Sequence, residues 1–86
     1  MPKKTWKELV VGQTYLVTEI KKLETRYGPK MIFIINEGSS QFQIFLLPRM
    51  SNVLYPNEEL YNNLAAKANK LELCILNLGD SRFTIV

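Results

Sequence analysis

The stretch PNEELYNNLAAKAN, residues 56–69, decides the fold, because it carries the clearest helical pattern in the chain. Leu60, Leu64 and Ala68 recur every four residues and form a narrow apolar stripe along one side of a helix. A proline at the start and the acidic pair Glu58-Glu59 beside the positive end of the helix dipole favour a helix start there. We therefore expect one helix, from residue 56 or 57 to residue 69, that can seal one surface of the core.

Before this helix, β-branched and aromatic residues between turn signals predict three strands, at residues 14–25, 31–36 and 41–47. In the first strand, Leu16, Thr18 and Ile20 are expected to face the core. The alternation breaks at Lys21-Lys22, which predicts a β-bulge at that point. A further helical turn is expected at residues 49–52.

After the helix, two more strands are expected at residues 70–78 and 82–86, joined by a turn. The order is β-β-β-α-β-β, which predicts an all-β domain: a small five-stranded barrel with one helix between its third and fourth strands, as in the OB fold. We expect residues 1–86 to form a single domain. Residues 1–5 are expected to be a loose basic arm, with Trp6, Leu9 and Val10 covering one end of the core.

The chemical inventory argues against an enzyme. The chain has no histidine, one cysteine and one aspartate, Asp80, in a predicted turn. It therefore lacks the commonest general base and the commonest metal ligand, and the four glycines form no phosphate-binding loop. We expect no catalytic residues, no metal and no cofactor.

Composition also bounds the location and the partners. The longest apolar runs are far shorter than a membrane-spanning helix, and the first residues do not form a secretory signal. A single cysteine, Cys74, fits a reducing compartment and is expected to be a buried, inert thiol. These features predict an intracellular protein, cytoplasmic or nuclear, that does not act at a membrane.

The positive charge is concentrated in the first part of the chain. Residues 1–30 carry seven basic and three acidic side chains, whereas residues 31–86 carry four basic and five acidic ones. Five candidate binding residues lie around the turn between the first two strands: Lys21, Lys22, Arg26, Tyr27 and Lys30. The lysine and arginine side chains can neutralise phosphates, and Tyr27 can stack on a nucleobase. OB barrels bind oligonucleotides with this loop and with the face of strands two and three. The alternative is an ordinary solvated hairpin.

The side-chain phase of residues 31–36 is left open, because this strand is apolar on both faces. If Ile32 and Ile34 face the core, Phe33 stands outside with Phe45, and both rings can stack on bases. In the opposite phase Phe33 belongs to the core. Phe42, Ile44 and Leu46 are expected to face inward in either case.

Three weaker candidates complete the predicted site. Gln43 could contact base edges or sugars beside Phe45, Arg49 could extend the basic track after the third strand, and Arg82 lies near the expected loop between strands four and five.

Two segments carry a resemblance to a known family. The segments LETRYGPKMI, residues 23–32, and FQIFLLP, residues 42–48, resemble those of small OB-fold single-stranded DNA-binding proteins of viruses and mobile elements. The shared pattern is a threonine, a basic-aromatic-glycine turn, a basic residue opening an apolar strand, and a second strand ending in aromatic-leucine-proline. The resemblance covers about residues 14–50. It implies non-catalytic coating of single strands during DNA replication or recombination, although this chain lacks the acidic tail of many bacterial single-strand binders.

These observations predict largely sequence-independent binding of single-stranded DNA, with RNA also possible, through phosphate neutralisation and base stacking. The alternative is a protein-interaction module whose apolar outer sheet face pairs with another chain. A homodimer or higher homo-oligomer is compatible with both hypotheses.

Overall fold

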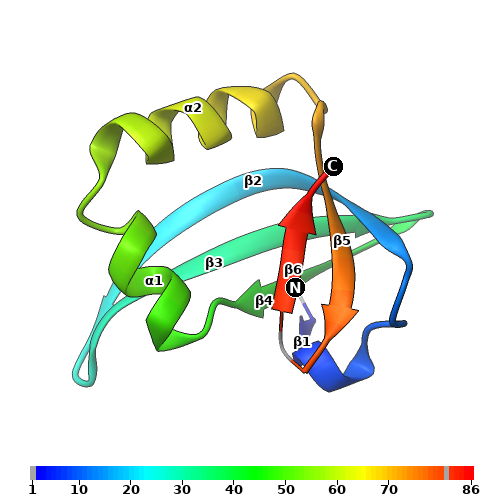
Figure 1. Cartoon of the computed structure of the whole chain (residues 1–86), viewed down its shortest axis with the longest axis horizontal. Helices are drawn as coiled ribbons and strands as arrows, with labels where there is room; N and C mark the ends of the chain where they lie inside the picture. The colour runs from blue at the N-terminus through cyan, green and yellow to red at the C-terminus, as the bar shows by residue number, and fades with distance from the viewer. Residues whose placement is uncertain (1, 81) are drawn as a thin grey trace.

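The computed structural model describes residues 2–80 and 82–86. Over these residues the protein is mostly β: six strands form one curled sheet, a half-barrel, against which two α-helices and a short 3-10 helix pack (Figure 1). The elements are β1 (Lys3–Lys4), η1 (Trp6–Glu8), β2 (Thr14–Thr25), β3 (Gly28–Glu37), β4 (Ser40–Phe45), α1 (Pro48–Leu54), α2 (Glu58–Asn69), β5 (Leu73–Gly79) and β6 (Arg82–Ile85).

The strand order in the sheet is β1-β4-β3-β2-β5-β6. Strands β2, β3 and β4 follow one another as antiparallel hairpins, and β5 returns after the helices to pair antiparallel with β2. Three hairpin strands and a fourth that returns beside the first form a Greek key. The expectation of a mostly β, barrel-like domain is confirmed, but the sheet has six strands rather than five, and α1 adds a second helix.

The additional strand, β1, lies in the segment expected to be a loose arm. Lys3 and Lys4 pair parallel with Gln43 and Ile44 of β4, and the amide of Gln43 donates to the carbonyl oxygen of Pro2 over 2.9 Å. The N-terminal segment therefore extends the sheet beyond β4.

The core lies on the concave side of the sheet, which we call the inner face. Met31, Phe33 and Ile35 of β3 point into it, and each is at most 1% exposed. Phe42, Ile44 and Leu46 are buried there too, as expected from their alternation. The phase of β3 is thereby settled, with Ile32 and Ile34 on the opposite, outer face.

The β-bulge in β2 lies at Thr18 rather than at Lys21-Lys22. The pairing with β3 shifts between Val17 and Glu19, so Val17 faces inward before the bulge and Ile20 after it. The predicted inward set Leu16, Thr18 and Ile20 is therefore wrong for its first two members. Thr18 is the extra residue, and its hydroxyl donates to the carbonyl oxygen of Ile34 over 3.3 Å.

The helices cover one open side of the half-barrel. The side chain of Asn57 caps α2 by accepting from the amide of Leu60 over 3.0 Å, and Leu64 and Ala68 are buried against the core. Helix α2 runs alongside β2 (Figure 1). Pro48 begins α1, as suits a residue without an amide hydrogen at a helix start.

Aromatic packing joins the N-terminal segment to the last strand. The Trp6 ring stacks on Phe83 of β6 with 5.3 Å between centroids and 1° between planes. Trp6 and Leu9 are buried, as expected for a cover over the core, whereas Val10 is 59% exposed. Cys74 is partly exposed in β5, rather than fully buried. None of the helices in residues 2–80 and 82–86 combines the length and the apolar character needed to cross a lipid bilayer.

Candidate nucleic-acid interface

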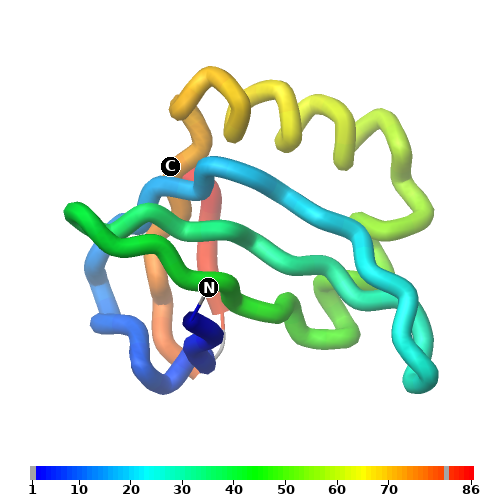
Figure 2. The backbone as a smooth tube through the Cα atoms, turned by 180° about the vertical axis from the view of Figure 1, so that it is seen from behind, coloured from blue at the N-terminus to red at the C-terminus, as the bar shows by residue number. Residues whose placement is uncertain are grey.

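The outer face of β2, β3 and β4 carries four of the ten predicted site residues, and two more lie at the tip of the hairpin between β2 and β3. Figure 2 views the molecule from this side, with the three strands nearest the viewer and β5 and β6 behind them. Pairing places Lys21, Ile32 and Phe45 in one row across the strands. Lys30 lies beside Leu23 toward the hairpin end, and Gln43 lies beside Ile34 and next to Lys3 of β1.

Charge on this face is predominantly positive. Lys3 and Lys21 are exposed and Lys30 is half-buried, while Glu19 is an exposed carboxylate beside Ile34. Adjacent strands lie about 4.8 Å apart, so the backbones of β2 at Lys21 and β4 at Phe45 lie about 10 Å apart. At this spacing, the phosphates of one bound strand can contact Lys21 while one of its bases reaches the Phe45 ring.

Phe45 presents a half-buried ring on the outer face, with the ammonium of Lys3 4.3 Å from its centroid. A cation over an exposed aromatic ring stabilises by about 0.5–1 kcal/mol, and a stacked base by about 1–3 kcal/mol. A base can therefore displace Lys3 from the ring, and the released ammonium can then pair with a phosphate. The sequence did not indicate Lys3 as a binding residue, because a strand of two residues has no recognisable local pattern.

The hairpin between β2 and β3 holds Arg26 and Tyr27 at its tip. The Thr25 hydroxyl donates to the carbonyl oxygen of Gly28 over 2.9 Å and accepts from the amide of Tyr27 over 3.1 Å. Gly28 adopts φ 106°, which side chains with a Cβ rarely tolerate. These contacts fix the turn while leaving the Tyr27 ring 82% exposed.

Comparisons of this chain with protein families, with curated proteins and with solved structures found no match.

Phe33 is not available for base stacking, which corrects one of the two sequence interpretations. Its side chain is 1% exposed, and its ring meets the Phe83 ring edge to face at 5.5 Å. The phase of β3 places it on the inner face, where it fills the core.

The side chain of Lys22 also lies away from the outer face. Its ammonium lies 4.3 Å from the Tyr61 ring centroid and 5.0 Å from that of Tyr55, on the helix side of β2. The Tyr61 hydroxyl donates to the carbonyl oxygen of Ile20 over 3.1 Å. Lys22 thus fastens β2 to the helices, and the prediction that it contacts nucleic acid is not supported by its position.

The same cluster includes an ionisable pair. The hydroxyl of Tyr55 lies 3.5 Å from a carboxylate oxygen of Glu24. Partial burial, and then the neighbouring Glu24 carboxylate, raise the pKa of Tyr55 above its ordinary value of 10.0.

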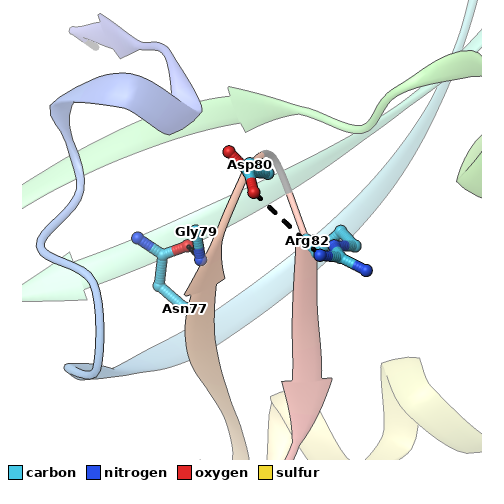
Figure 3. A network of polar contacts seen from close by, with 4 residues as sticks. All are labelled: Asn77, Gly79, Asp80 and Arg82. Atoms are coloured by element: carbon cyan, nitrogen blue, oxygen red, sulfur yellow. Dashed lines mark hydrogen bonds and ion pairs between the residues drawn. The ribbon is translucent and has the colours of Figure 1, made fainter.

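Two predicted residues lie away from the outer face. Arg49 is exposed in α1, directly after β4. Arg82 begins β6, at the opposite edge of the sheet from β4, and its guanidinium lies 4.0 Å from the exposed carboxylate of Asp80 (Figure 3). The structure does not bring either arginine onto the row formed by Lys21 and Phe45.

Hydrogen bonds of Asn77 hold the end of β5. The buried Asn77 side chain donates to the carbonyl oxygen of Leu9 over 3.2 Å. It also accepts from the amide of Gly79 over 3.2 Å (Figure 3). Asn77 therefore ties β5 to the N-terminal segment and has its polar atoms satisfied. Within residues 2–80 and 82–86, no three potential metal-ligating side chains are grouped.

Proposed function

We propose that this protein is an OB-type barrel that binds single-stranded nucleic acid along the outer face of β2, β3 and β4. The observation that carries the proposal is the row of Lys21, Ile32 and Phe45 across the outer face, with the exposed Tyr27 at the tip of the hairpin formed by β2 and β3. The Greek-key half-barrel supports the OB assignment, since OB folds are partly open Greek-key barrels that bind oligonucleotides on this face. Preference for DNA rests on the resemblance in residues 23–48.

Affinity comes in part from charge. Lys3, Lys21, Lys30 and Arg26 lie on the outer face or at its hairpin end, and each can neutralise one phosphate. About four such contacts give a slope of roughly −3 for log affinity against log salt, at about −0.7 per phosphate on single strands. Glu19 lies among these cations and lowers the net attraction.

The remaining affinity comes from flat rings. The bonds of Thr25 hold the backbone of the turn at Tyr27, so stacking on this ring requires no ordering of the turn. Phe45 takes a second base once Lys3 moves aside. Stacking accepts any base, and binding is therefore largely independent of sequence.

The alternative, a protein interface on the same face, has less support. Ile32 and Ile34 are the apolar residues at its centre, and they are only 5% and 3% exposed. Their neighbours on β2 and β4 already cover them, so they offer little apolar area to a second chain.

A fluorescence anisotropy titration of labelled oligo-dT at several salt concentrations tests the proposal. We expect binding at low salt that weakens with the slope given above. Absence of binding at low salt, or binding that does not respond to salt, would refute it. Light scattering at the same concentrations reports whether the mass of the free protein changes, which separates strand binding from self-association.

A further inference from the structure

We propose that a pocket between the segment Lys3–Lys7 and the end of β4 holds one unstacked nucleotide of the bound single strand. The pocket, called here the N-terminal pocket, has a volume of about 380 Å³, and Phe45 and Leu47 line its β4 side. The inference rests on the proposed function and adds to it a specific subsite with its own reporter, Trp6.

The lining suits a base with its phosphate. Trp6, Phe45 and Leu47 give apolar walls. Three lysines, Lys3, Lys4 and Lys7, also line the pocket, with no acidic side chain in the lining, although the ammonium of Lys4 lies over the Phe42 ring, 4.6 Å from its centroid. The nearby Glu8 is engaged, because the amide of Thr5 donates to its carboxylate over 2.6 Å. Apolar walls with a cationic rim match a flat base attached to an anionic backbone.

The volume suits a small part of the strand. Pockets that bind small ligands measure about 300–1,000 Å³, and the N-terminal pocket lies near the small end of this range. This size fits one nucleotide better than two. A nucleotide of a single strand is free to turn away from its neighbours and enter, whereas base pairing in a duplex opposes this.

The pocket continues the outer face. Phe45 and Lys3 belong to both, and Lys3 lies over the Phe45 ring at their junction. A strand that runs from Tyr27 across the row of Lys21 and Phe45 reaches the pocket at the edge of the sheet.

The walls are fixed before binding. The Trp6 ring nitrogen donates to the carbonyl oxygen of Phe45 over 3.0 Å, and the ring stacks on Phe83. A preformed pocket takes its ligand with a small ordering cost. Because Trp6 is the sole tryptophan in the chain, all tryptophan fluorescence comes from a ring that lines this pocket.

The test measures total binding and pocket occupancy separately. Total binding is followed by the anisotropy of labelled oligo-dT, and occupancy by Trp6 fluorescence in the same titration with unlabelled oligo-dT. A single abasic site is then moved through the shortest oligo-dT that keeps full affinity, so that the protein cannot shift along the strand to avoid it. We expect the Trp6 signal to change on binding, and one abasic position to abolish that change while weakening binding by about 5-fold to 100-fold.

Two matched pairs of variants complete the experiment. Leu47→Phe narrows the pocket, while Val53→Phe places the same ring on an exposed position of α1. Lys7→Glu reverses a rim charge, while Lys67→Glu reverses an exposed charge on α2. We expect the first member of each pair to weaken binding and to reduce the Trp6 change, and the second to leave both near the wild-type values.

The outcomes are distinguishable. If oligo-dT binds with unchanged Trp6 fluorescence and no abasic position stands out, the pocket is not a subsite, although the outer-face proposal survives. If no oligonucleotide binds at low salt, both proposals fail. The abasic series uses the wild-type protein, so it decides the matter even if Leu47→Phe fails to fold.

Discussion

Lys21 and Lys22 are neighbours in β2, yet their side chains lie on opposite faces of the sheet. Lys21 pairs across the outer face with Ile32, whereas the ammonium of Lys22 lies between the rings of Tyr55 and Tyr61. The chain thus carries two identical side chains in adjacent positions with different environments. One faces the proposed ligand and the other joins β2 to the helices.

This arrangement predicts different effects for the two alanine substitutions. Lys21→Ala should reduce the magnitude of the salt slope for oligo-dT binding by about 0.7, because one phosphate contact is lost. Lys22→Ala should leave the slope unchanged and lower the free energy of unfolding by about 0.5–2 kcal/mol, because a cation is removed from two rings. Salt-dependent anisotropy and urea unfolding measure the two quantities. Equal salt slopes for the two variants would contradict the assignment of faces.

Tyr27→Ala should weaken oligo-dT binding by about 1–3 kcal/mol with little change in the free energy of unfolding. The ring is 82% exposed, so removing it costs the folded state few contacts. Tyr27→Phe serves as the control, since it retains the flat ring and should bind like the wild type. If the alanine variant binds as tightly as the phenylalanine variant, Tyr27 does not stack on a base.

Phe33 and Phe45 should respond in opposite ways to substitution. Phe33→Ala removes a buried ring and should cost about 3–5 kcal/mol of stability, a large share of what a small domain has. Phe33→Leu keeps most of the volume and should bind oligo-dT normally. Phe45→Ala should remain folded and lose affinity. Thermal unfolding and anisotropy of the three variants test this, and a selective loss of affinity in Phe33→Leu would return Phe33 to the binding site.

The pKa of Tyr55 should fall toward its ordinary value in Glu24→Gln, because the variant removes the carboxylate that opposes ionisation of the phenol. Subtracting the titration of Tyr55→Phe from that of the parent, followed by ultraviolet absorbance, isolates this group from the other three tyrosines. Because folding raises the pKa of Tyr55, protonated Tyr55 contributes to the stability of the folded state below pH 10. This contribution is lost as the pH rises through the pKa of Tyr55 in the folded protein. Identical difference titrations in the presence and absence of Glu24 would contradict the coupling.

Elements with a strong local pattern could be predicted from the sequence. The bounds of β2 follow from its β-branched and aromatic content. The inward positions of Phe42 and Ile44 in β4, and of Leu46 directly after it, follow from strict alternation. The helix at residues 58–69 follows from its periodic stripe and its favourable start.

Features that depend on distant partners could not be predicted. The apolar residues of β3 suit both faces of a sheet, so its phase is set by pairing with β2 and β4. The bulge lies at Thr18, where the sequence shows no break, whereas the visible break at Lys22 is resolved by two tyrosines more than thirty residues away. Strand β1 exists only because β4 offers it an edge.

The contact between β6 and the N-terminal segment is made by side chains, whereas the strands of the sheet are joined by backbone hydrogen bonds. Among the described strands, β6 pairs with β5 alone, and the stacked rings of Trp6 and Phe83 hold it to the N-terminal segment. Such a ring pair adds about 0.5–1.5 kcal/mol beyond the burial of its area, and its contact is less directional than a backbone ladder. Residues 82–85 therefore have a backbone ladder on one side only, and their amide hydrogens should exchange with solvent before those of β2 and β3.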